Sequence, residues 1–129
     1  MLSLFKKAPP SPVGPDYSHV DSIAKAEALV ISGELAKLHL LPAAFGGAEV
    51  RENTVYVPPF VTEIKQRIDE NTVMSLVEQG QVRRYVATPK YQGKSIVPTS
   101  IVINATEPAN FGASIAIWGD GLNANQDAA

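Results

Sequence analysis

The hydrophobic pattern near the start of the chain predicts a helix over about residues 18–32. Ser18 stands three residues before Asp21, as in a capping box, and Gly33 is suited to end the helix. The polar residues Asp21, Lys25 and Ser32 fall on one narrow stripe. Most of the remaining circumference is apolar or small: Val20, Ile23, Ala24, Ala26, Ala28, Val30 and Ile31. We therefore expect this helix to be covered on more than one side, by a sheet or by a second copy of the chain.

Two short strands are expected next. Residues 35–41 are apolar with Lys37 and His39 interspersed, and proline and glycine follow. Residues 49–57 contain β-favouring types, and the Pro58–Pro59 pair ends the segment because proline has no N–H to donate to a ladder.

Pro59 is well placed as the first residue of a second helix. The apolar residues Phe60, Val61, Ile64 and Ile68 recur at helical spacing after it. The pattern leaves two alternatives for residues 60–79. One helix could continue to Gly80, or the chain could break and restart with Asn71 as a new cap.

After Gly80 the chain changes to β-favouring residues. Strands are predicted over residues 82–88, 95–105 and 113–118, with turn signals at 92–93 and 107–110. Alternation in the middle strand places one apolar set on a single face: Val97, Thr99, Ile101, Ile103 and Ala105. Pro98 lies on the other phase and indicates a bulge or an edge near the start of that strand.

Together these elements predict an α+β fold in the order α-β-β-α-β-β-β. We expect a mostly antiparallel sheet of about five strands with two or three helices on one face. Residues 1–15 hold four of the ten prolines, and residues 119–129 are almost entirely small or polar. Both ends are therefore predicted to be flexible tails around a single domain at 16–118.

Composition narrows the classes of function. The formal net charge is -2, whereas nucleic-acid binders usually carry a basic excess, so we expect no nucleic-acid partner. The absence of cysteine excludes disulfides, thiolate metal sites and thiol nucleophiles. Residues 1–10 do not read as an export signal, and no apolar run is long enough to span a bilayer, so we expect a soluble cytoplasmic protein.

One basic cluster is a candidate contact patch. Between residues 81 and 106 there are four cations and no acid: Arg83, Arg84, Lys90 and Lys94. They could grip a phosphate or an acidic partner beside Tyr85 or Tyr91. Adjacent strand residues point to opposite faces, however, and charges commonly protect sheet edges, so an ordinary solvated strand is the favoured interpretation.

No motif for catalysis, metal binding or cofactor binding stands out. The two histidines, His19 and His39, lack a second ligand at helical spacing. Ser114 follows Gly112 at the spacing of a nucleophile elbow, but the second glycine is missing and a strand follows. No phosphate-binding glycine motif is present, so no cofactor is expected.

The leading hypothesis is therefore a non-enzymatic interaction protein that self-associates as a homodimer, since about a hundred folded residues carry so much apolar surface. The alternative is a small-molecule binder or modest enzyme with a cavity between sheet and helices. The residues that would line such a cavity are His39, Tyr56, Tyr85 and Trp118.

Overall fold

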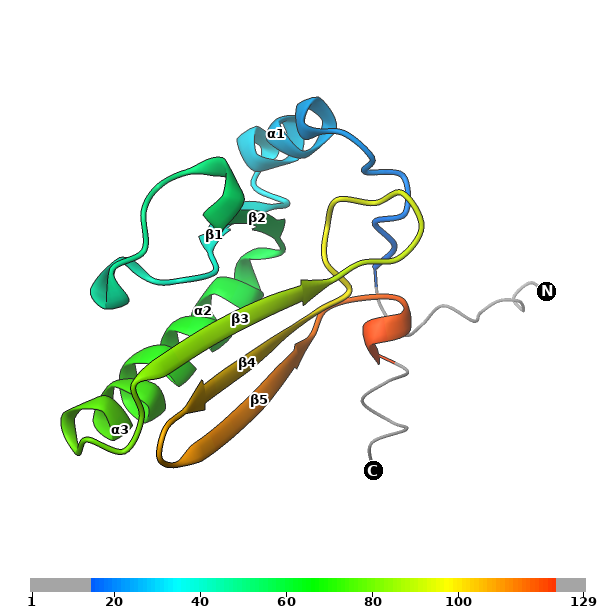
Figure 1. The fold of residues 1–129 in the computed structure, drawn as a ribbon. Coiled ribbons are helices and arrows are strands. Elements are labelled where there is room, and N and C mark those ends of the chain that lie inside the picture. The colour runs from blue at the N-terminus through cyan, green and yellow to red at the C-terminus, as the bar shows by residue number, and fades with distance from the viewer. Residues whose placement is uncertain (1–14, 123–129) are drawn as a thin grey trace.

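The computed structural model describes residues 15–122 and confirms the α+β architecture in the expected order (Figure 1). All five strands pair in antiparallel fashion, but they form two separate sheets instead of one. Within the described residues, no helix has the length and apolar character needed to cross a membrane. The predicted tail segments 1–14 and 123–129 lie outside the described residues.

Helix α1 (Ile23–Ser32) begins later than its sequence pattern predicted. The side chain of Ser22 accepts a hydrogen bond from the Lys25 backbone N–H at 3.2 Å, so Ser22 is the N-cap and the expected cap at Ser18 is wrong. Gly33 ends the helix with a φ of 88°, as expected. The rest of the chain covers this helix less than the apolar pattern predicted. Ala26 is its one buried residue, and Ile31 is 86% exposed.

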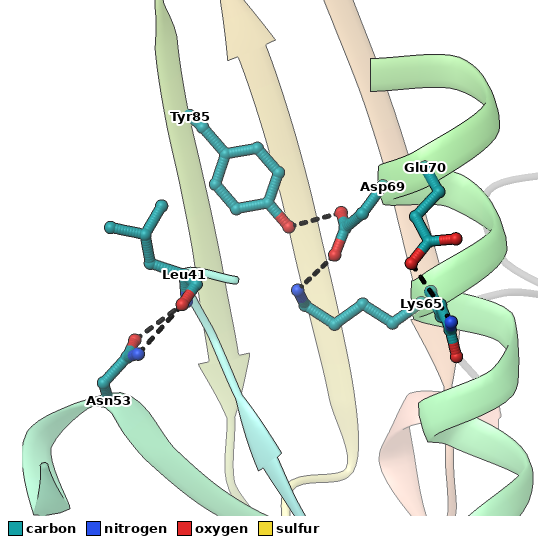
Figure 2. Close-up of polar contacts among 7 residues, drawn as sticks. Leu41, Asn53, Lys65, Asp69, Glu70 and Tyr85 are labelled. Carbon is teal, nitrogen blue, oxygen red and sulfur yellow. Dashed lines mark hydrogen bonds and ion pairs between the residues drawn. The ribbon is translucent and has the colours of Figure 1, made fainter. Parts of the chain in front are cut away.

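Strands β1 (Ala36–His39) and β2 (Thr54–Val57) form a two-stranded sheet that is shorter than the predicted segments. The long connection includes the 3-10 turns η3 (Ala43–Phe45) and η4 (Arg51–Asn53). Asn53 holds this connection closed, since its side chain bonds both the N–H and the carbonyl oxygen of Leu41 at 2.8 and 2.9 Å (Figure 2). Gly47 approaches the same carbonyl so closely that a Cβ atom would collide with it.

The second helical segment is continuous, which resolves the open alternative in favour of one helix. It begins as α2 (Pro59–Arg67), widens into the π-helical segment η5 (Ile68–Val73) and ends as α3 (Met74–Glu78). Asn71 therefore lies inside the helix and caps nothing. Pro59 occupies the first turn, as predicted.

The second sheet has the order β3-β4-β5, built from β3 (Arg84–Lys90), β4 (Ser100–Thr106) and β5 (Asn110–Ala116). Its alternation matches expectation, since the whole predicted apolar set from Val97 to Ala105 is buried. The strand itself starts only at Ser100, because Pro98 and the preceding residues form a buried loop. Figure 1 shows α2 crossing behind this sheet.

The core lies where α2, the three-stranded sheet and the β1–β2 sheet meet. Its centre comprises fully buried aliphatic residues from all three and from the loop before β4: Val57, Val61, Val97, Ile101 and Ile103. Trp118 closes one end and donates its indole N–H to the Val97 carbonyl at 3.0 Å. The chain then forms a turn over Gly119–Leu122, in the first part of the predicted C-terminal tail.

The position of the helix cap can be tested with two serine variants. Ser22→Ala is expected to reduce the free energy of unfolding by about 1 kcal/mol, because it leaves a first-turn N–H without its partner. Ser18→Ala is the matched control and should change stability by less than about 0.5 kcal/mol. Urea denaturation followed by circular dichroism measures both, and a larger loss from Ser18→Ala would place the cap where the sequence pattern put it.

Candidate functional site

A groove lies on the outer face of the β1–β2 sheet, and we call it the hairpin groove. Its floor is formed by two cross-strand pairs, Lys37 with Tyr56 and His39 with Thr54, whose side chains share one face. The groove has a volume of about 630 Å³. The remaining lining residues come from α1, the η4 region, β2 and the loop after β3: Ile23, Glu49, Val50, Arg51, Val55, Tyr91 and Ile96.

Three large apolar side chains stand exposed on the walls of this groove. Ile23 is 36% exposed, Val50 47% and Tyr91 51%, and they come from three segments far apart in the sequence. Exposed apolar residues scattered singly are ordinary, but their convergence on one concavity is typical of a contact surface.

Next to the floor, a small polar network links α1 to the hairpin. The Tyr56 hydroxyl donates to Glu27 at 2.6 Å, and the Lys37 ammonium contacts the same carboxylate oxygen at 2.9 Å. The hydrogen bond from Tyr56 and the contact with Lys37 lower the pKa of Glu27. The same bond to Glu27 raises the pKa of Tyr56. The network keeps Glu27 ionised and fixes Tyr56 at the groove floor.

His39 lies half-buried on the floor. Among residues 15–122 its imidazole forms no hydrogen bond or ion pair, even though Glu49 lines the same groove. Its imidazole is thus presented to whatever occupies the groove. It also borders a smaller cavity of about 280 Å³ between β1 and α2.

A buried polar cluster lies at the inner wall of that smaller cavity (Figure 2). The Lys65 ammonium contacts one oxygen of Asp69 at 2.7 Å, and the Tyr85 hydroxyl donates to the other oxygen at 2.6 Å. The Lys65 nitrogen also lies 5.3 Å from the centre of the Tyr85 ring. Lys65 is 1% exposed and Asp69 5%. The cluster therefore links the long helix to β3 through groups shielded from water.

Burial dominates the electrostatics of this cluster. It lowers the pKa of the Lys65 ammonium, and Asp69 opposes the shift without cancelling it. Burial also raises the pKa of the Tyr85 hydroxyl, and the hydrogen bond to Asp69 raises it further. Tyr85 consequently remains a neutral donor well into the alkaline range. Both oxygens of Asp69 are occupied, so the arrangement holds a charge pair in place.

The structure separates the four residues predicted to line one cavity. His39 and Tyr56 meet in the hairpin groove. Tyr85 points to the Lys65–Asp69 pair and borders a different, largely apolar cavity of about 690 Å³ beside Phe45. Trp118 is 2% exposed and packs edge-on against Tyr17, so it belongs to the core.

The predicted basic patch divides between the two ends of β3. Arg83 and Arg84 lie 3.8 and 3.5 Å from the carboxylate of Glu107, one residue beyond the acid-free window that defined the patch. Lys90 ends the strand, roughly 20 Å away for six strand steps. Lys94 follows in the loop that carries Tyr91, and neither lysine forms an ion pair with a described residue.

Lys65 and Asp69 were not among the residues predicted from the sequence to form a site. Their spacing of four residues on a predicted helix is a detectable signal for an ion pair, but exposed helices carry many such pairs. Lys25 and Asp21 show the same spacing and are exposed on the surface. The one signal for the burial of Lys65 is the apolar character of its neighbours on the helix. These are Val61 and Ile64 on the preceding turn and Ile68 on the next.

In the described part of the chain, no three His, Cys, Asp or Glu side chains come together as a possible metal site. Comparisons of the chain with protein-family models, with curated proteins and with solved structures found no match. The function must therefore be argued from the surfaces of the molecule.

The buried pair gives a prediction about stability. Lys65→Met leaves the Asp69 carboxylate buried without its cation and should cost about 3 to 5 kcal/mol of unfolding free energy. Lys25→Met removes the same kind of partner from the exposed Asp21 and should have no measurable effect. Chemical denaturation compares the two variants, and equal effects would contradict the importance of burial.

Tyr85 gives a prediction for alkaline pH. Its hydroxyl has a raised pKa in the folded chain, so above about pH 10 the unfolded chain releases a proton that the folded chain retains. Its contribution to stability is complete below that pH and is lost as the pH rises further. Tyr85→Phe should therefore be less stable at neutral pH but lose less stability between pH 9.5 and pH 11.5. Denaturation curves over that range measure the slopes, and parallel slopes would contradict the assignment.

Proposed function

We propose that the chain is an interaction protein that binds an extended, acidic and apolar segment of a partner protein in the hairpin groove. The observation that carries this proposal is the convergence of Ile23, Val50 and Tyr91 on one concave surface. Each comes from a different part of the chain, so no single local pattern accounts for their meeting. A partner that covers them would remove apolar area from water.

The shape of the groove favours a polypeptide segment. Its volume falls within the range of small-molecule sites, but those sites bury most of the ligand surface. Here the apolar wall residues are 36% to 51% exposed in the free chain. An occupant with alternating side chains can place one side chain on the floor and others against the walls.

The charges of the lining favour an acidic occupant. Lys37 and Arg51 are cationic, and His39 can donate a hydrogen bond. Glu49 is the one acidic lining residue among those described, whereas Glu27, next to the floor, already bonds Tyr56 and Lys37. Lys94 adds a cation to the loop that carries Tyr91. Carboxylates beside an aromatic or aliphatic residue match this arrangement.

The small-molecule alternative draws support from one observation, which is that His39 and Tyr56 share the groove floor. A small polar ligand would depend on these two side chains and much less on the exposed walls. The dependence of binding on the wall residues therefore separates the two proposals.

Two valines of nearly equal exposure provide the test. Val50 lies in the groove and is 47% exposed, whereas Val86 is 48% exposed on the outer face of β3, away from the groove. The probe is a displayed library of random dodecapeptides selected on the wild-type protein. We expect enriched peptides to combine an aromatic or aliphatic residue with Asp or Glu. Their Kd should rise about fivefold or more for Val50→Asp and stay unchanged for Val86→Asp.

Fluorescence polarisation with one synthetic enriched peptide measures both variants. Equal affinities for the wild-type protein and Val50→Asp would overturn the proposal. So would equal losses for the two variants, because these would indicate a general effect of added negative charge.

A further inference from the structure

Within residues 15–122, the three-stranded sheet has two free edges, β3 and β5, and the hydrogen bonds at the ends of β5 fix the direction of its backbone groups. The Ile117 N–H donates to Thr99 at 2.8 Å and the Glu107 N–H to Ala109 at 2.9 Å, at the two ends of the β4–β5 ladder. Hydrogen-bonded and non-hydrogen-bonded pairs alternate along an antiparallel ladder. The N–H and carbonyl groups that face away from β4 therefore belong to Asn110, Gly112, Ser114 and Ala116.

The opposite edge, on β3, is protected against pairing. By the same alternation its outward backbone groups belong to Tyr85, Ala87 and Pro89. Pro89 has no N–H to offer, and the strand carries charges at both ends, Arg84 and Lys90. Edge prolines and charges are the usual means by which proteins prevent edge-to-edge association.

Strand β5 has none of these protective features. Its seven residues include no charge and no proline, and its register with β4 runs without a bulge. Three of the four residues with outward backbone groups are exposed. Within residues 15–122, those groups have no backbone or side-chain hydrogen-bond partner. Figure 1 shows β5 as the outermost strand of the sheet.

We propose that β5 pairs with β5 of a second copy of the chain, antiparallel about a two-fold axis at Ala113. This register pairs Asn110 with Ala116 and Gly112 with Ser114, so every outward group obtains a partner. The two sheets become one continuous sheet of six strands.

The sequence of β5 argues for a second copy as the occupant. Around Ala113 the side chains are symmetric in size, with large residues at Phe111 and Ile115 and small ones at Gly112 and Ser114. Under the two-fold operation Phe111 lies opposite Ile115 on the helix-covered face, as an aromatic–aliphatic pair. Because the strand is uncharged, no like charges meet near the axis.

This inference is independent of the hairpin groove, since none of the β5 residues lines it. It goes beyond the proposed binding function by naming a surface for self-association. It also differs from self-association through α1, which was expected from the sequence and would use the exposed face around Ile31.

A single cysteine tests the register, because the chain has none of its own. At the two-fold axis the two Ala113 residues form a non-hydrogen-bonded pair with Cα atoms about 4.5 Å apart, which permits a disulfide. Ala113→Cys should form a covalent dimer on mild oxidation, whereas Ala87→Cys on the β3 edge should not. Non-reducing electrophoresis reads the outcome, and equal crosslinking of both variants would overturn the register.

A second experiment measures the non-covalent dimer by sedimentation velocity over a concentration series. Ser114→Pro removes an outward N–H and should raise the dimer dissociation constant about tenfold or more, whereas Ala87→Pro should leave it unchanged. If circular dichroism shows that Ser114→Pro is unfolded, Ser114→Lys takes its place. The lysine variant keeps the backbone intact and places a cation on the exposed face beside the two-fold axis. A wild-type monomer at the highest soluble concentration would overturn the proposal. So would a dimer that survives the Ser114 variants or is lost only in Ile31→Lys.

Discussion

The arrangement of this protein depends on one buried charge pair and the tyrosine that completes it. Lys65 and Asp69 lie in the middle of the long helix, out of contact with water, and Tyr85 reaches them from β3. A charge in such a place is tolerated only when it is paired and hydrogen-bonded. The three residues meet these requirements together, and they fix the rotation of the helix against the sheet. The π-helical segment begins at Ile68, next to Asp69, whose carboxylate contacts both Lys65 and Tyr85.

That fixed helix also determines where the two sheets lie. The β1–β2 sheet packs its apolar face toward the helix, so its polar face, with Lys37, His39, Thr54 and Tyr56, is left to form the floor of the hairpin groove. The three-stranded sheet is covered by the helix on one face and open on the other. Because neither β1 nor β2 extends the three-stranded sheet, β3 and β5 are its edges within residues 15–122, and of these two β3 is the protected one. The groove and the β5 edge are thus separate surfaces produced by the same division of the strands.

The candidate site could be predicted only in part. His39 and Tyr56 were predicted to line a cavity. Both lie on the same face of the β1–β2 sheet, where each is paired with a residue of the other strand. Tyr85 and Trp118 were grouped with them because they too are aromatic residues in predicted strands. In the structure Tyr85 bonds a buried carboxylate, whereas Trp118 fills the core. None of the exposed wall residues was predicted to line a cavity, although Tyr91 was named beside the candidate basic patch. Val50 follows Ile23 by about 27 positions, and Tyr91 follows Val50 by about 41. Residues so far apart share no local sequence pattern from which their proximity could be predicted.

The sequence by itself determined the order of the elements, the end of the first helix at Gly33, the start of the second at Pro59 and the buried face of β4. Each of these follows from local rules, since glycine and proline restrict the backbone and alternation marks a buried face. The tertiary structure alone decided that the strands form two sheets, that Lys65 is buried while Lys25 is exposed, and which sheet edge remains open. Those outcomes depend on the pairing of distant strands and on which side chain is shielded from water. The free energy of such long-range contacts is not encoded in the spacing of neighbouring residues.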